Sequence, residues 1–209
     1  MEAIEHKIEE ALAPGAFIRD AESFTFASLL ESVKAEIDAL VDVDGGAKTA
    51  ATLFETFAAA CVAKANANEI DDSSGSFGEF VRSLLLSCMR AQQRAGVPAA
   101  DVVRKMRWWI DRDDYGFCTH LEEEAPTVLD ANGQRELERA LTERLESATG
   151  EKPEWQKHSA LISLKALAET QGDIEKLVGF CERGVLTSKD CLRVARLYDQ
   201  RGDAGRALE

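Results

Sequence analysis

Two copies of one short pattern decide the fold, Ala-Glu-Thr-Gln-Gly-Asp (Ala168 to Asp173) and Tyr-Asp-Gln-Arg-Gly-Asp (Tyr198 to Asp203). The glycines of the two copies lie 30 residues apart, and an aspartate follows each of them. Self-similarity at such a period is typical of stacked helical repeats, because one helix pair cannot bury its own apolar face. The region 161–209 therefore predicts two helix pairs packed on each other.

Apolar residues recur at helical spacing along the rest of the chain as well. We therefore predict an all-α protein, an α-α superhelix of about ten to eleven antiparallel helices. The alternating pattern and the hairpin turns of strands are missing, so no sheet is expected. The predicted helices cover about 2–13, 21–42, 47–68, 76–95, 99–111, 117–129 (kinked or split at Pro126), one opened by Gly133, and four from Pro153 onwards.

The segment Thr149 to Pro153 is the best candidate for a domain boundary, since proline suits the first position of a helix. It divides the chain into an N-terminal helical domain (1–150) and a repeat region (151–209) that we expect to be continuous with it. The last predicted helix opens at Asp203 and stops at Glu209, after less than two turns. We therefore expect a truncated repeat region, a native chain that continues further, and possible self-association through the open C-terminal end.

The net charge of -13 and the 45% apolar composition limit the class of protein. Nucleic-acid binding requires a basic face, and no cluster of Lys and Arg stands out, so a nucleic-acid partner is disfavoured. No run of 18 apolar residues could span a membrane, and the acidic N-terminus is unlike a secretory signal. These features predict a cytoplasmic protein whose protein or peptide partner is basic.

The five cysteines are widely spaced and lie in apolar surroundings. Such cysteines are typical of reduced thiols in the cytosol, and Cys61, Cys88, Cys181 and Cys191 are predicted to be buried. Zinc would require closely spaced pairs, and no Cys-x-x-Cys is present. We therefore expect neither a metal nor another cofactor.

The unit Leu192 to Leu208 resembles a tetratricopeptide repeat. Ala195 stands at the small-residue position of the first helix, Tyr198 at the tyrosine and Gly202 at the turn glycine, while Ala207 is the small residue of the second helix. The upstream copy departs from the pattern, with Lys165 for the small residue and Ala168 for the tyrosine. Its period is also shorter than the usual 34 residues.

The whole chain is also similar to an uncharacterised bacterial family of helical-repeat proteins, whose members occur alone or joined to a SWIM-type zinc finger. The resemblance rests on Ile8 to Ile18, on Ile70 to Gly78, and on the repeat region. It implies an α-solenoid and no established activity. This chain contains no Cys-x-Cys, so the zinc finger itself is absent.

Two glycine-containing stretches are similar to known ligand-binding loops, but neither matches the required residue pattern. The loop Glu69 to Ser76 is acidic, yet an EF-hand counted from Asp71 would need a glycine where Ser76 stands and a glutamate where Arg82 stands. Ser76 and Glu79 instead predict a capping box for the next helix. Gly45 to Thr49 is similar to the end of a phosphate loop, but Val41 replaces its first glycine and no strand precedes it, so a helix start is favoured.

The segment Trp108 to His120 is the densest mixture of aromatic, acidic and titratable side chains. Its candidate binding residues are Trp108, Asp113, Asp114, Tyr115 and His120. The carboxylates and the histidine could serve acid-base chemistry or metal ligation if they converged in a pocket. The competing interpretation is a turn in which the carboxylates cap the next helix. Cys118 and His120 are two residues apart and would point to different faces of a helix, so they predict no nucleophile-base pair.

The sequence thus favours a non-catalytic scaffold that binds a protein or a peptide, with no predicted catalytic residue and no metal site. The first alternative is an enzyme with an acidic and aromatic site around Trp108 to His120. The second is an accessory of nucleic-acid machinery, which only the resemblance to the zinc-finger relatives suggests. A deep pocket would favour the enzyme, an open groove the scaffold, and a basic stripe the nucleic-acid accessory.

Overall fold

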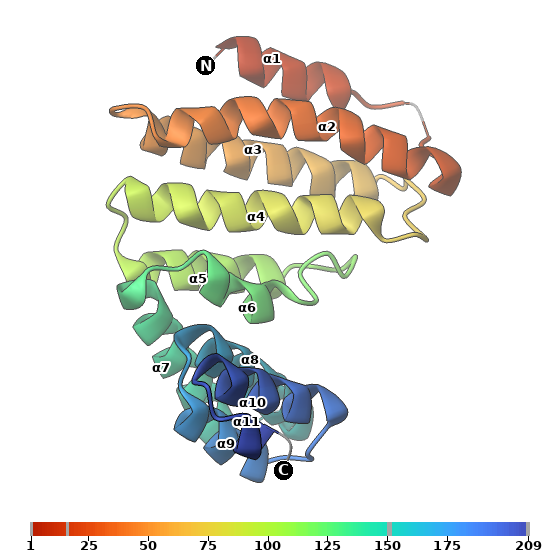
Figure 1. Ribbon diagram of the computed structural model, residues 1–209. Helices are drawn as coiled ribbons and strands as arrows, with labels where there is room; N and C mark the ends of the chain where they lie inside the picture. Colours follow the sequence, from red (N-terminus) through yellow and green to blue (C-terminus); the bar gives the residue numbers. More distant parts are fainter. Residues whose placement is uncertain (1, 16, 150–151, 208–209) are drawn as a thin grey trace. The chain divides into compact units, whose positions relative to one another are not determined.

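A computed structural model describes residues 2–15, 17–149 and 152–207, and every regular element within them is a helix (Figure 1). The all-α prediction is confirmed. In the described residues an isolated bridge between Ile18 and Ile70 is the nearest approach to a strand. The helices are α1 (Glu2–Ala11), α2 (Asp20–Val41), α3 (Gly46–Asn66), α4 (Ser76–Arg94), α5 (Ala99–Ile110), α6 (Leu121–Glu124), the 3-10 helix η1 (Ala125–Thr127), α7 (Ala131–Ser147), α8 (Pro153–Gln171), α9 (Ile174–Glu182), α10 (Ser188–Gln200) and α11 (Ala204–Ala207).

The chain divides into two compact units, Met1–Leu121 and Glu122–Glu209. Helices α1 to α5 belong to the first unit, and η1 with α7 to α11 belong to the second. The segment 149–153, where the sequence suggests a boundary, lies inside the second unit between α7 and α8, and these two helices pack against each other.

Helices of the first unit pack on neighbours one or two positions along the chain. Thus α1 contacts α2 and α3, α2 contacts α3 and α4, and α4 contacts α3 and α5. The reason lies in the apolar stripes, such as Leu30, Val33 and Ile37 on α2, which are buried at helical spacing. The second unit repeats this arrangement, since α8 contacts α7, α9 and α10, and α10 contacts α9 and α11.

Phenylalanines fill the centre of the first unit. Phe54, Phe57 and Phe77 have no exposed surface. The Phe57 ring meets the Phe80 ring edge-on at 5.5 Å between centroids, and the Phe77 ring meets Phe117 edge-on at 5.7 Å. Such edge-to-face contacts add to the free energy gained by burying the rings. The core therefore joins α3 and α4 to the segment that follows α5.

Two connections of the first unit are tied together at one end of its helices. The backbone N–H of Ile18 donates to the carbonyl of Glu69, and the N–H of Asp71 donates to the carbonyl of Ile18. The buried Lys64 ammonium donates to the Ala13 carbonyl at 3.1 Å and to the Glu69 carboxylate at 3.0 Å. The loop after α3 is thereby fixed to the loop after α1.

The capping box predicted for α4 is wrong, although the loop is a capped connection as expected. Gly75 is the N-cap residue, with φ of 77°, and Ser76 is already inside the helix. The Asp72 carboxylate takes the capping role, accepting from the N–H of Phe77 at 2.8 Å and of Gly78 at 2.7 Å. The left-handed conformation of Gly75 places the Asp72 carboxylate over the N-terminus of α4, so Ser76 has no capping position.

The helix predicted over 117–129 is much shorter in the structure. Residues 113–120 form turns, α6 has four residues, and η1 continues from it with Pro126 in its first turn. Proline supplies no N–H and fixes φ, so the α-helical bonding pattern ends there. The predicted split at Pro126 is confirmed, whereas the predicted start at Phe117 is wrong.

The repeated pattern of the second unit has the same backbone geometry in both copies. Gly172 and Gly202 adopt φ of 68° and 76°, the left-handed conformation that favours glycine. Each following aspartate accepts from the N–H three residues ahead, Asp173 from Lys176 at 3.0 Å and Asp203 from Arg206 at 3.2 Å. Pro153 in the first turn of α8 is also confirmed, and Thr187 forms a capping box with Asp190 at the start of α10.

Lys165, which replaces the small residue of the repeat pattern, is buried rather than turned to solvent. Its ammonium donates to the Asp190 carboxylate at 2.8 Å, and both side chains are at least nine-tenths buried. The same Asp190 oxygen accepts from the N–H and hydroxyl of Thr187. The long lysine thus reaches from α8 to the N-terminus of α10, where a small residue would allow direct helix packing.

Candidate functional site

The five candidate binding residues of the sequence lie in one segment but do not form one site. Trp108 is 40% exposed on the outer face of α5, while Trp109 is 8% exposed and packs inward. The Lys105 ammonium and the Arg112 guanidinium each lie 4.6 Å from the centre of the Trp108 ring. These cation–π contacts give Trp108 a local structural role at the surface.

Asp113 holds a turn together. Its carboxylate accepts from the N–H of Gly116 at 2.9 Å and of Cys118 at 2.5 Å. Asp114 is exposed beside it. A carboxylate that accepts from backbone donors stabilises the loop. Gly116 and Cys118 precede α6, so Asp113 fixes its own turn and does not cap the next helix in the way that the sequence suggested as the alternative to catalysis.

Tyr115 and His120 do line a common pocket, of about 360 Å³, within the first unit. Asp72, Glu79 and Arg82 of the α4 end share it. Trp108, Asp113 and Asp114 are not among its lining residues, so the proposed acid-base set does not converge there. The described residues also contain no group of three metal-ligating side chains.

All five cysteines are free thiols. Burial raises the pKa of Cys61, and it raises the pKa of Cys88 and of Cys118 to about 12, so these thiols stay protonated and weakly nucleophilic. Cys61, Cys88 and Cys181 are buried as predicted, but the prediction for Cys191 is wrong. The inward face of α10 is formed by Asp190, Arg193 and Leu197, which turns Cys191 to the outside.

A groove of about 600 Å³ runs along the outer face of α3. The lining residues from α3 recur at helical spacing. The other side of the groove is formed by Gln92 near the end of α4 and by Ala95 and Val97 of the loop that follows. Most of the exposed surface of the lining is apolar, although five of the nine lining residues are polar or charged, and the small side chains leave the groove open. The α3 residues are Lys48, Ala51, Thr52, Glu55, Thr56 and Ala59.

The polar groups of this groove differ in whether they are already paired. Glu55 forms an ion pair with Lys105 of α5 at 2.5 Å. Among the described residues, no partner satisfies the side chains of Lys48, Thr56 or Gln92. A mainly apolar groove with a few convergent polar groups is the usual form of a binding site.

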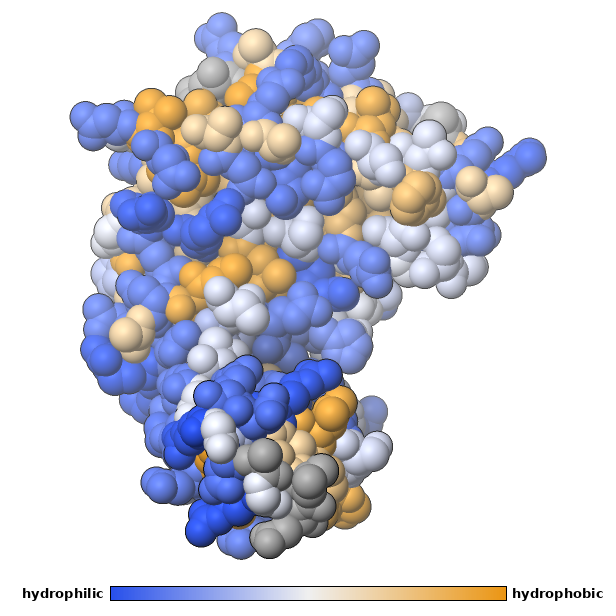
Figure 2. Space-filling model, viewed as in Figure 1, coloured by the Kyte–Doolittle hydropathy of each residue, from blue (hydrophilic) through white to orange (hydrophobic). Residues whose placement is uncertain are grey.

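Sequence reasoning missed this groove because it followed only the inward stripe of α3. The outward positions carry a signal of their own, since the exposed Thr52, Thr56 and Ala59 and the half-buried Ala51 are all small for the outer face of a long helix. Figure 2 shows, on the face it draws, small hydrophobic patches separated by hydrophilic residues. A groove with small lining residues is therefore easier to recognise from geometry than from hydropathy.

In the described part of the chain, no helix combines the length and apolarity needed to cross a membrane. Comparison of the chain with protein-family models, with curated proteins and with solved structures gave no match.

Proposed function

We propose that this protein is a non-catalytic helical-repeat scaffold that binds a segment of another protein in the groove along α3. The observation that carries the proposal is the groove itself. It combines a volume of about 600 Å³ with a lining surface that is mostly apolar and with three polar side chains that have no partner among the described residues. Its open form suits a chain segment better than an enclosed small molecule.

The proposed architecture is an α-α superhelix of the tetratricopeptide type. It is supported by the packing of helices on neighbours one and two positions along the chain within each unit. It is also supported by the shared turn geometry of Gly172 and Gly202. Solenoids of this kind offer extended faces to protein partners. We also propose that the chain belongs to the helical-repeat family that its whole sequence resembles.

Binding is preferred over catalysis because the candidate catalytic groups have other roles. The carboxylate of Asp113 accepts from backbone N–H groups, and the raised pKa values of Cys88 and Cys118 disfavour thiolates. A catalytic pair would need a nucleophile and a base within hydrogen-bonding reach.

The experiment is a selection of short random peptides, displayed on phage, against the full chain. Ala59→Trp fills the groove, and Ala35→Trp is the matched control because Ala35 is an exposed alanine on α2. We expect selected peptides to bind the wild-type and Ala35→Trp proteins equally, and Ala59→Trp at least tenfold more weakly. Peptides that bind all three proteins equally would contradict the proposed function, and a second groove-filling variant, Thr56→Phe, guards against an effect peculiar to Ala59.

A further inference from the structure

Lys48 places a positive charge at one end of the α3 groove although the chain as a whole is acidic. Lys48 lies in the first turn of α3, where the helix dipole already places partial positive charge. That turn contains no acidic residue, and Gly45 at the N-cap offers no side chain to the helix end. A cation at this position is itself unfavourable, so a carboxylate brought to it would be stabilised by both the ammonium and the helix end.

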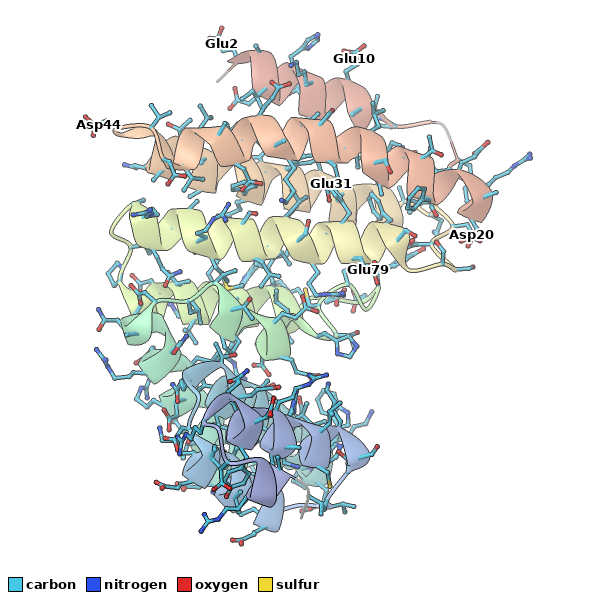
Figure 3. All side chains as sticks on the ribbon, viewed as in Figure 1. Glu2, Glu10, Asp20, Glu31, Asp44 and Glu79 are labelled. Carbon is cyan, nitrogen blue, oxygen red and sulfur yellow. The ribbon has the colours of Figure 1, made fainter. Side chains whose placement is uncertain are left out.

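The neighbouring carboxylates do not neutralise Lys48. Glu55 is paired with Lys105 at 2.5 Å, and Asp42 lies 3.4 Å from Arg94. Asp44 stands at the tip of the loop between α2 and α3 and points away from the helices (Figure 3). The positive charge of Lys48 is thus available to a ligand in the groove.

The other free polar groups indicate the form of the ligand. The Thr56 hydroxyl and the Gln92 amide can pair with backbone N–H and C=O groups, which an extended segment leaves open and a helix does not. From Lys48 to Ala59 the lining covers about 16 Å of α3 at the usual helical rise. An extended segment of about five residues has the same length. The small side chains of Ala51 and Ala59 leave room for it.

We propose that the groove binds an extended, acidic segment of a partner protein, with one carboxylate placed at Lys48 and its backbone paired with Thr56 and Gln92. This inference rests on the proposed function and names its ligand. It departs from the basic partner that net charge suggests, because local charge at a binding site decides the fit while net charge governs long-range attraction. A second copy of this chain is disfavoured, since two chains of charge -13 repel each other.

The test uses peptides from the same phage selection, measured one by one by fluorescence anisotropy. We expect the groove-dependent peptides to be enriched in Asp and Glu. Lys48→Glu should weaken their binding about tenfold or more, Lys48→Arg should restore it, and added salt should weaken wild-type binding. The fold should survive, because glutamate suits the first turn of a helix. Lys152→Glu is the matched control, an exposed lysine of the second unit with the same change of charge.

The outcomes separate this inference from the proposed function. Groove-dependent peptides without acidic residues, or with unchanged affinity for Lys48→Glu, would overturn the acidic ligand and leave the scaffold standing. A dimer that Ala59→Trp dissociates in analytical ultracentrifugation would put a second copy in the groove and overturn it as well. If no peptide depends on the groove, both proposals fail.

Discussion

The two units of this protein both have apolar cores, but they differ in what else holds their helices together. In the first unit the contact between α3 and α4 is aromatic, with Phe54, Phe57 and Phe77 fully buried. In the second unit Ala168 of α8 and Leu197 of α10 share an apolar cluster, and the contact between these helices also contains buried charges, those of Lys165, Asp190 and Arg193. Apolar packing tolerates small changes of shape, whereas a buried ion pair requires both partners to be present. The two units should therefore respond differently to single and paired substitutions.

The ionic contact extends beyond the central pair. Arg193 lies 2.9 Å from the Glu169 carboxylate and 4.0 Å from the Asp190 carboxylate, and Glu123 at the start of the second unit lies 2.9 Å from Lys189. Opposite charges therefore alternate between α10 and its neighbours. Because each charge has a partner, the cost of removing them from water is offset by pairing and by hydrogen bonds.

Phe57→Ala should give the largest loss of stability, in the apolar unit. It removes a ring with no exposed surface and leaves a cavity next to Phe80, which costs about 4 kcal/mol in comparable cores. Chemical denaturation followed by circular dichroism measures the loss. Phe24→Ala is the matched control, because Phe24 is 70% exposed on α2 and its loss should change stability by about 0.5 kcal/mol at most. Equal effects of the two variants would refute this account of the first unit.

Asp190→Asn should give the next largest loss, about 3 kcal/mol, because it leaves the Lys165 ammonium buried without its counter-ion. The double variant Lys165→Met with Asp190→Asn should recover most of that loss, since the orphaned charge is removed with its partner. A denaturation series on the three proteins measures the coupling between the two residues. Additive effects would mean that the second unit is held by packing alone, and the contrast between the units would disappear.

The sequence predicted the apolar stripes better than the buried ion pair, for a physical reason. An apolar stripe such as Leu30, Val33 and Ile37 is visible as a period, and burial follows from it. Lys165 and Asp190 look like surface residues until the fold brings them together from positions 25 residues apart. No local pattern signals a buried pair between distant charges, so the departure of Lys165 from the repeat could be noted but not explained.

The candidate site shows the same limit. The residue types of the segment 108–120 predicted a candidate site. Whether its carboxylates converge depends on backbone geometry, and the Asp113 carboxylate accepts hydrogen bonds from its own loop instead. The groove along α3 depends on the space that small residues leave open, and composition does not record empty space. Residue types therefore indicate which side chains could bind a ligand. Only the fold shows which of these side chains are free to do so.

The ionic contact should also make stability depend on pH. Burial by itself would raise the pKa of Asp190, but hydrogen bonds from Lys165 and Thr187 outweigh it and hold the pKa below its usual range. A carboxyl with a lowered folded-state pKa contributes stability above its unfolded pKa of about 3.9 and loses that contribution as the pH falls through the folded value. We expect the difference in unfolding free energy between wild type and Asp190→Asn to be constant at neutral pH and to narrow in acid below that value. Denaturation at a series of pH values measures this, and a gap that widened in acid would reverse the assigned direction of the pKa shift.

The smallest expected effects concern the two aspartates of the repeated turn, which have the same hydrogen-bond role in different settings. Asp173 caps α9, a helix of nine residues whose Ile174, Leu177 and Cys181 are buried. Asp203 makes the equivalent bond at 3.2 Å to a four-residue helix, and its side chain is 47% exposed.

Removing an N-cap typically costs about 1 kcal/mol when the helix is part of the cooperative core. We therefore expect Asp173→Ala to cost about that much and Asp203→Ala less than half of it, because a short helix with few buried contacts opens locally without unfolding the unit. Hydrogen exchange distinguishes the two cases, since Asp173→Ala should speed exchange throughout α8 and α9 while Asp203→Ala should affect α11 alone. If Asp203→Ala also accelerated exchange in α10, the second turn would belong to the same cooperative structure as the first, and the sequence repeat would be matched in stability as well as in geometry.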